Sequence, residues 1–222
     1  MNEKVLLIND HAFELITLSE VLTVRGINIV GKAQTLVAAE SFFRTLHPDV
    51  VVIDIGFNSM DGVALGVRLR ALRPEIGVVH TTSCSDMRLL GIRERELSHS
   101  SIVVLKRSIG DLDLLCEAIL GSAAARSRQD NVIWVNKFPQ LDENSHSSIV
   151  GDLTDIQVET LRLVSRGFSN SEIAKIRFVS EKAVEQIVAR IAAAMGFAAD
   201  RRKNLRVLMT NEFNRWVGSS GI

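Results

Sequence analysis

The chain has few of the features that mark secreted, metal-stabilised or membrane-spanning proteins. Only two of its 222 residues are cysteines, Cys84 and Cys116, so neither a disulfide framework nor a cysteine-based zinc site can organise the fold. Uninterrupted apolar runs such as Val5–Ile8 are far shorter than the roughly 20 residues that span a bilayer. Asn9 and Asp10 interrupt the first run too early for a signal peptide. We therefore expect a cytoplasmic protein with no membrane partner.

The chain also lacks net charge, but its charges are unevenly distributed. Residues 1–120 contain 12 Lys and Arg against 15 Asp and Glu, whereas residues 152–222 contain 11 against 8. An acidic part joined to a mildly basic part predicts two modules with different partners. The basic excess is too small to identify a nucleic-acid binder by itself.

Within residues 1–121, short apolar runs alternate with helical patterns. The expected strands are Val5–Ile8, Ile27–Val30, Val50–Ile53, Val78–His80 and Ile102–Leu105. The expected helices are His11–Arg25, Leu36–Leu46, Val63–Leu72, Asp86–Leu97 and Leu112–Leu120. Fully apolar strands that alternate with helices indicate a parallel sheet covered on both faces. The sequence thus predicts an α/β, flavodoxin-like doubly wound domain with five parallel strands.

The rest of the chain divides into a polar segment and a helical one. Residues 122–151 are mostly polar, with many Ser and Asn residues and weak periodicity, and predict a linker with one short apolar element at Val132–Val135. From Asp152 the periodicity is helical, with expected helices near 155–166, 170–177, 180–195 and 201–217. Residues 152–222 are therefore expected to form an all-α domain of four helices.

Polar residues follow four of the five expected strands. They are Asn9 and Asp10, Asp54, Thr81 and Thr82, and Lys106. Because the C-terminal ends of parallel strands meet at one edge of a sheet, these side chains should line one cleft. Clustered carboxylates suit Mg²⁺, and a carboxylate beside a cation can attack a phosphoryl donor. Any one of these residues alone is better explained as the polar start of a loop, but the agreement of four strands favours a site.

The same residues carry a family resemblance. The segments Val5-Leu6-Leu7-Ile8-Asn9-Asp10-His11, Val51-Val52-Ile53-Asp54 and Met60-Asp61-Gly62, with Thr82 and Lys106, resemble the receiver domain of two-component response regulators. The resemblance implies that Asp54 accepts a phosphoryl group from a sensor histidine kinase. It also implies that Asp10, Asp54 and the backbone of Gly56 hold Mg²⁺, and that Thr82 and Lys106 are the switch residues.

Three departures from the family pattern affect this interpretation. Asn9 stands where the family has a second acid, so Mg²⁺ would be held more weakly. Val103 stands where an aromatic residue is expected, and the chain has no tyrosine. Between Thr82 and Lys106, Arg and Glu residues replace the usual Ala- and Gly-rich segment. A receiver that works through a fixed conformation, or through another ligand, remains an alternative.

In the helical part, the expected third helix has two distinct faces. Val184, Ile187, Val188 and Ile191 recur at helical spacing and predict a buried stripe. The outward residues are Lys182, Glu185, Gln186 and Arg190. Ser180 is expected to cap this helix, Ser169 or Asn170 the preceding one, and Thr154 the first. In a helix-turn-helix the outward face would enter the major groove, but periodicity alone favours a dimerising helical bundle.

A second resemblance separates these alternatives. Leu153-Thr154, Leu161-Arg162-Leu163-Val164, Gly167-Phe168-Ser169-Asn170, Glu172-Ile173-Ala174 and Val179-Ser180-Glu181-Lys182 resemble the LuxR-type helix-turn-helix domain. The resemblance implies that the third helix reads DNA and that the fourth dimerises through Leu205, Leu208, Met209 and Trp216. Glu185 and Ala189 replace bases that are usual in the family, which weakens contacts to phosphate.

The sequence therefore predicts a dimeric two-component response regulator, of the NarL/FixJ class, that binds specific DNA as a transcription factor. The alternatives are a degenerate regulator that acts through protein–protein contacts and a transcription factor that needs no phosphorylation. No further nucleophile–base pair is present, so we do not expect an enzyme.

Overall fold

The computed structural model describes residues 3–56, 61–106, 112–124, 132–135, 146–197 and 202–218. Two compact units emerge. One consists of Met1–Thr82 and Glu94–Pro139, and the other of Ser83–Arg93 and Gln140–Ile222. The described helices include none that is long and apolar enough to cross a membrane.

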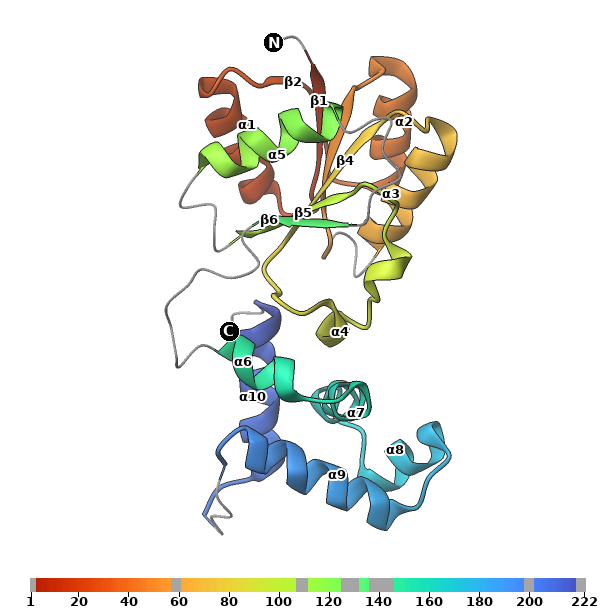
Figure 1. The fold of residues 1–222 in the computed structure, drawn as a ribbon, viewed down its shortest axis with the longest axis vertical. Coiled ribbons are helices and arrows are strands. Elements are labelled where there is room, and N and C mark those ends of the chain that lie inside the picture. The colour runs from red at the N-terminus through yellow and green to blue at the C-terminus, as the bar shows by residue number, and fades with distance from the viewer. Residues whose placement is uncertain are drawn as a thin grey trace. The chain divides into compact units, whose positions relative to one another are not determined.

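The first unit is built around a wholly parallel sheet in the order β2-β1-β3-β4-β5-β6 (Figure 1). The strands are β1 (Lys4–Ile8), β2 (Asn28–Ala33), β3 (Val50–Asp54), β4 (Gly77–Thr82), β5 (Ile102–Leu105) and β6 (Ile133–Val135). The first five follow the order of flavodoxin-like folds, which confirms the predicted fold class.

The prediction of five strands is wrong by one. β6 lies inside the segment that the sequence marks as a linker, at the apolar element expected there. It pairs with β5, and the amide of Ile133 donates to the carbonyl oxygen of Ser101 at 2.9 Å. An edge strand exposes unpaired backbone groups that readily bind another extended segment, and the three residues of β6 pair with Ile102, Val103 and Val104 of β5.

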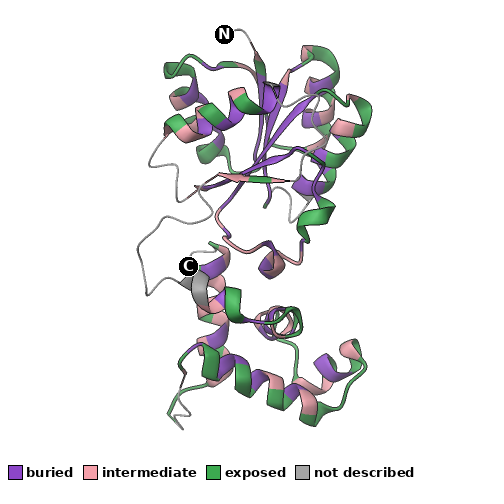
Figure 2. Cartoon of the chain, viewed as in Figure 1, coloured by how far each residue is buried: buried purple, intermediate pink, exposed green. Residues whose placement is uncertain are grey.

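Helices cover both faces of the sheet. They are α1 (Ala12–Val24), α2 (Leu36–Leu46), α3 (Asp61–Leu72) and α5 (Leu112–Ala124). Along β1, Val5 and Leu7 join the apolar cluster that includes residues of α1 and α5, whereas Leu6 and Ile8 join the cluster with residues of α2 and α3. Successive side chains point to opposite faces of a strand, so a strand covered on both sides is apolar throughout. Figure 2 shows buried residues in the central strands β1, β3, β4 and β5, whereas the edge strands β2 and β6 are less buried.

The predicted helix over Asp86–Leu97 is wrong. The structure has a short α4 (Met87–Leu90) followed by a 3₁₀ turn, η2 (Glu94–Glu96). Gly91 ends α4 with a φ of +77°, a conformation in which glycine pays no Cβ penalty. Cys84, just before this segment, and Leu89 within it are buried in the core of the second unit.

The second unit is helical. Its remaining helices are α6 (His146–Asp152), α7 (Asp155–Ser165), α8 (Asn170–Arg177), α9 (Glu181–Ala194) and α10 (Leu205–Val217). α6 also lies in the segment predicted as a linker. The core draws on α6 through α10, with Val150, Leu161, Ile173, Val184 and Met209 all buried.

Side-chain caps set the start of these helices. The hydroxyl of Thr154 accepts from the amide of Gln157, and the Gln157 side chain accepts from the amide of Thr154, which completes a capping box. Ser169 caps α8 and Ser180 caps α9 in the same manner, each accepting from the amide three residues on. The caps expected at Thr154 and Ser180 are confirmed, and Ser169 rather than Asn170 caps α8.

Candidate functional site

Asp54 ends β3 and is almost completely buried at the C-terminal edge of the sheet. Its Oδ1 atom lies 2.9 Å from Nζ of Lys106, which directly follows β5. The same oxygen accepts a hydrogen bond of 3.3 Å from Oγ1 of Thr81 on β4. Three neighbouring strands thus bring a carboxylate, an ammonium and a hydroxyl together.

Two glycines let the chain pass close to Asp54. A Cβ atom at Gly62 would lie 2.3 Å from the carbonyl oxygen of Asp54, a distance that no side chain tolerates. A Cβ atom at Gly56 would lie 3.1 Å from Oδ2 of Asp54. Gly62 therefore lets α3 approach the backbone of Asp54, and Gly56 lies beside its carboxylate; neither position leaves room for a larger residue.

Glu14, in the first turn of α1, completes the cluster. Its Oε2 atom lies 2.8 Å from Nζ of Lys106 and accepts a hydrogen bond of 2.7 Å from the amide group of Asn9. The buried Asn9 also uses its Oδ1 atom to accept from the amide of His11 at 2.8 Å. Lys106 therefore bridges two carboxylates, and Asn9 holds one of them.

The charges shift one another's pKa values. Burial raises the pKa of Asp54, and the attraction of Lys106 offsets this only in part. Partial burial also disfavours the ionised form of Glu14, but hydrogen bonds from Lys106 and Asn9 outweigh it and lower its pKa. Burial lowers and the Asp54 charge raises the pKa of Lys106, with a net rise. Lys106 thus remains a cation between its two partners.

The outward face of α9 is the second candidate site. Lys182, Glu185, Gln186 and Arg190 are exposed, together with Ala189, while Val184, Val188 and Ile191 are buried. α8, a turn at Phe178-Val179 and α9 form a helix-turn-helix. Phe178 adopts a left-handed conformation in the turn and is 95% exposed.

Residues 5–93 match the family model of the response regulator receiver domain. The chain carries a response regulator receiver domain. Asp54 lies within the matched residues, and Lys106, with which it forms an ion pair, lies beyond them.

Known proteins resemble the chain over most of its length. The response regulator protein VraR of Staphylococcus aureus (strain NCTC 8325 / PS 47) is 24% identical over 196 residues, which are 88% of this chain and 91% of VraR. A structure of two RcsB dimers bound to two parallel DNAs covers 100% of both chains with a TM-score of 0.54 at 19% identity. RcsB from Salmonella enterica serovar Typhimurium, bound to a promoter in the presence of phosphomimetic BeF₃⁻, covers 97% of this chain and 100% of its own, with a TM-score of 0.52 at 21% identity. At this identity the two structures establish a shared fold.

The receiver domain's hydroxyl contact comes from a neighbour of the expected residue. Thr82 is buried at the end of β4, opposite Leu105 of β5, but the hydroxyl that donates to Asp54 belongs to Thr81. In the strand register Thr81 stands directly opposite Asp54. A threonine pair in the sequence does not reveal which member faces the carboxylate, because that depends on the pleat.

The donor set around Asp54 is compatible with Mg²⁺ but sparse. Among the described residues, no group of three or more His, Cys, Asp or Glu side chains could hold a metal ion. A hard cation here would rely on the carboxylates of Asp54 and Asp10, the carbonyl of Gly56 and water. Asp10 is exposed, and Gly56 lies next to the carboxylate.

Glu14 is not among the residues expected in the receiver domain's cleft. Its only signal in the sequence is its place four residues after Asp10, one helical turn into α1. Within a helix an acid in the first turn is ordinarily explained by the helix dipole, so the sequence alone gives no reason to assign it to the site.

The expected dimerisation stripe on α10 needs revision. Met209 and Trp216 are buried in the helical unit's own core, and Leu205 packs against that core. Leu208 is half-buried, and Val207 beside it is 53% exposed. Periodicity identifies an apolar face correctly but cannot say whether its partner is the same chain or another.

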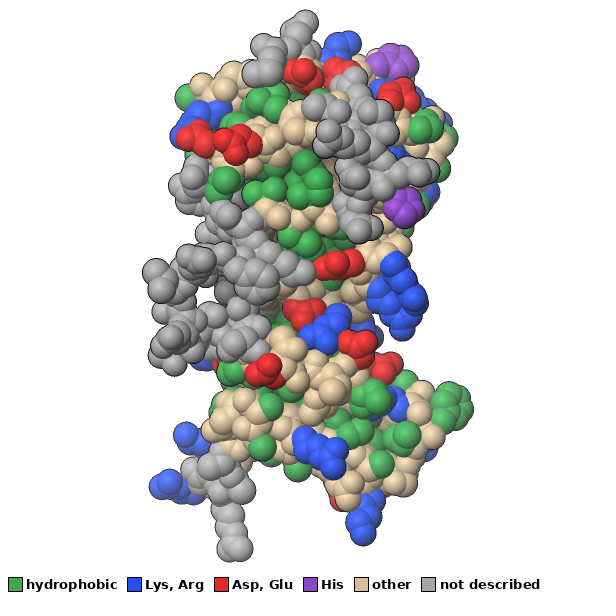
Figure 3. Space-filling model, in the orientation of Figure 1, with side chains coloured by type: hydrophobic (Ala, Val, Ile, Leu, Met, Phe, Trp, Pro, Cys, Tyr) green, Lys and Arg blue, Asp and Glu red, His purple; other side chains and the backbone are tan. Residues whose placement is uncertain are grey.

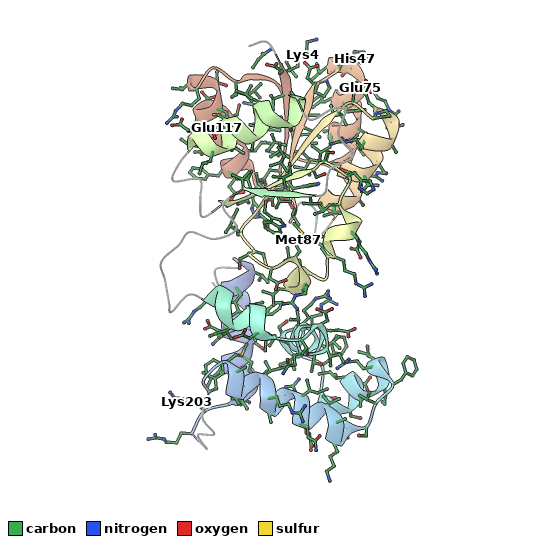
Figure 4. The ribbon with its side chains drawn as sticks, in the orientation of Figure 1. Lys4, His47, Glu75, Met87, Glu117 and Lys203 are labelled. Carbon is green, nitrogen blue, oxygen red and sulfur yellow. The ribbon has the colours of Figure 1, made fainter. Side chains whose placement is uncertain are left out.

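Basic side chains on the helical unit are scattered. The face in Figure 3 shows separate Lys and Arg side chains rather than one continuous patch. Lys203, labelled in Figure 4, is exposed before α10, as is Arg202. Arg201, the third member of the expected basic cluster, lies outside the described residues.

Proposed function

We propose that this protein is a two-component response regulator that binds specific DNA sequences as a homodimer in the cytoplasm and is switched by phosphorylation of Asp54. The observation that carries this proposal is the outward face of α9, which exposes Lys182, Gln186 and Arg190 in a chain that also holds a receiver domain. The RcsB structures named above contain DNA, and they share the fold of the whole chain.

At the receiver domain, the chemistry is transfer of a phosphoryl group to Asp54. Oδ1 is occupied by Lys106 and Thr81, so Oδ2 would form the bond to phosphorus while the bond from phosphorus to the kinase histidine breaks. Lys106 would pair with the transferred oxygens, and a threonine hydroxyl would donate to them. Asp10, Asp54 and the Gly56 carbonyl would hold Mg²⁺, which supplies neutralising charge when bound.

At α9, each exposed polar side chain has a plausible partner on DNA. Gln186 can form two hydrogen bonds to adenine, and Arg190 can do so to guanine or contact phosphate. Lys182 would position the helix through phosphate, and Glu185 can accept from cytosine. Leu205 and Leu208 remain the candidates for the dimer contact, since Met209 and Trp216 are core residues.

Selection of duplexes from a random DNA pool by the purified protein, at physiological salt, tests the proposal. Specific complexes outlast the salt-screened background, so we expect an inverted repeat with half-sites about one helical turn apart. Failure to enrich any sequence, with and without a phosphoryl donor, would contradict DNA recognition.

The substitution Glu185→Lys tests whether α9 is the reading helix. It replaces a carboxylate that phosphate repels with an ammonium that phosphate attracts, so the affinity for the selected duplex should rise. The slope of log affinity against log salt concentration should steepen by about one to two units. Glu117→Lys on α5 (Figure 4) makes the same charge change far along the chain and serves as the control. Equal effects of the two substitutions would indicate a general charge effect rather than recognition by α9.

One observation favours a second function. Phe178 is 95% exposed, and Val179 and Ile176 beside it are each more than 40% exposed. Exposed apolar residues that cluster are typical of protein contacts. If no duplex is enriched, a regulator that binds a protein partner through this turn becomes the better interpretation.

A further inference from the structure

Glu14 occupies Lys106 before any phosphoryl group reaches Asp54. The lysine ammonium lies 2.8 Å from Glu14 and 2.9 Å from Asp54, so both carboxylates are within direct ion-pair distance. Lys106 is the group that the proposed function assigns to the transferred phosphoryl oxygens. The Glu14 carboxylate therefore already takes up one hydrogen-bond donor of the Lys106 ammonium.

Asn9 and Glu14 fit one another as a pair. The Asn9 amide donates to Glu14 Oε2 at 2.7 Å and accepts from the His11 amide on its other side. An aspartate at position 9 would bring two carboxylate oxygens to the same short distance, where like charges repel strongly. The departure at position 9 and the acid at position 14 are thus complementary: the amide can hold the glutamate that a second acid would repel.

We propose that Glu14 is a positioning residue of the receiver site, which holds Lys106 and must release it before the lysine can pair with a phosphoryl group on Asp54. The proposal rests on the function proposed for Asp54. The Glu14 side chain is 46% exposed, so it can turn toward water without leaving a buried charge unpaired. In this chain, acceptance of a phosphoryl group therefore includes an exchange of one anion for another at Lys106.

Three variants separate contact from charge. Glu14→Gln keeps the size of the side chain but leaves only a neutral hydrogen bond to Lys106. Glu14→Asp keeps the charge but shortens the side chain by one methylene, so the carboxylate no longer reaches the lysine. Glu20→Gln removes an exposed charge from the same helix, away from the site, and is the matched control.

The measurement is the half-saturating concentration of beryllofluoride with Mg²⁺ on the full chain, read from the bound ¹⁹F resonance. Partly exposed ion pairs contribute modest energies, so Glu14→Gln and Glu14→Asp should each lower the half-saturating concentration about two- to fivefold. Glu20→Gln should match the wild type. The ¹⁵N resonance of the Lys106 ammonium should also shift in both Glu14 variants without beryllofluoride, which a purely structural role would not produce.

The outcomes distinguish this inference from the proposed function. Equal binding by the wild type and both Glu14 variants would overturn the positioning role and leave Asp54 as the acceptor. A change in Glu14→Gln alone would show that charge, and not contact with Lys106, matters, and would also overturn it. Absence of bound signal in every protein would overturn phosphorylation at Asp54 and, with it, the role of Glu14.

Discussion

His80 is a fully buried side chain on β4 whose Nδ1 atom has no hydrogen-bond partner among the described residues. Burial, with a smaller contribution from the charge of Arg70, lowers its pKa from 6.5 to about 4. The folded protein therefore keeps this histidine neutral at a pH where the unfolded chain protonates it. Below pH 6.5 the histidine is protonated in the unfolded state but stays neutral in the folded state. The free energy of unfolding therefore falls as the pH is lowered, until the pH reaches about 4.

Replacing His80 by leucine should remove this loss. Between pH 7 and pH 4.5 the free energy of unfolding of the receiver unit should decline less in His80→Leu than in the wild type. The difference is up to about 3 kcal/mol for a pKa lowered from 6.5 to about 4. Hydrogen exchange of β3 and β4 amides at each pH measures it. His99→Leu, at an exposed position, should leave the pH dependence unchanged, and a decline as steep in His80→Leu as in the wild type would contradict the assignment.

At the scale of one residue, the sequence predicts chemistry better than contact. Asp54 and Lys106 are identifiable because each follows an apolar strand, and the structure joins them. Thr81 is expected at this edge, but its contact with Asp54 depends on which way β4 pleats. Glu14 is not expected there, because its place depends on how α1 leaves β1. Neither of these is a property of the local residue pattern.

At the scale of elements, α3 packs on β4 through a glycine. A Cβ atom at Gly66 would lie 2.9 Å from Cε1 and 3.0 Å from Nε2 of the His80 ring. Gly121 on α5 is the opposite case, since its Cβ would meet only Cδ1 of Ile102, at 4.0 Å. The two helical glycines thus offer a matched comparison between close packing and open space.

Alanine at these two positions should have opposite effects. Gly66→Ala should destabilise the receiver unit by about 1–3 kcal/mol through overpacking. Gly121→Ala should stabilise it by about 0.5–1 kcal/mol through helix propensity. Urea unfolding followed by hydrogen exchange in α3 and α5 measures both. Gly66→Ala should cost less stability in a His80→Ala background, where the ring that the new methyl group would meet is absent. An equal cost in both backgrounds would show that the strain lies elsewhere.

Elements whose environment is uniform are the ones that the sequence predicts well. β5 and α2 have the predicted bounds because one is buried on both faces and the other is amphipathic between clear stops. β6 has only three residues and exists because the edge of β5 is open beside it. The prediction for α4 is wrong in the other direction: the helical pattern continues past Gly91, but Gly91 adopts a left-handed conformation and ends the helix there.

At the scale of the whole molecule, Arg88 holds the segment Ser83–Arg93 within the helical unit. Its guanidinium donates to the carboxylate of Asp86, to the carbonyls of Val150 and Leu153 at 3.0 Å each, and to Asp155 at 2.9 Å. The hydrogen bond to Asp86 is the main reason that the pKa of Arg88 is raised, against partial burial. Val150 belongs to the last turn of α6, and its carbonyl also accepts from the amide of Leu153 at 3.1 Å, so Arg88 adds a second hydrogen bond at the end of that helix.

Arg88→Met should therefore destabilise the helical unit. Loss of several hydrogen bonds to a charged donor should lower its free energy of unfolding by about 1–3 kcal/mol. Native-state hydrogen exchange of α7 amides provides the measurement. Arg95→Met in η2 is the matched control, because Arg95 is exposed. Equal protection of α7 in both variants would show that Arg88 is dispensable.

Membership of Ser83–Arg93 in the helical unit is not predictable from the sequence. Local periodicity reports that Leu89 is apolar, but it does not identify the surface that covers it. The motifs of the receiver continue across this segment to residue 93, so pattern and resemblance both assign it to the first unit. Packing assigns it to the second.

Because the chain crosses from one unit to the other three times, after residues 82, 93 and 139, the two halves are not interchangeable cassettes. A recombination event that joins a foreign output domain after residue 139 would leave Cys84 and Leu89 without the core that buries them. A fusion that transfers only residues 140–222 to another protein would produce a helical domain whose core lacks Cys84 and Leu89. A single exchange of domains would therefore also require new substitutions in Ser83–Arg93, so we expect the two units to be inherited together.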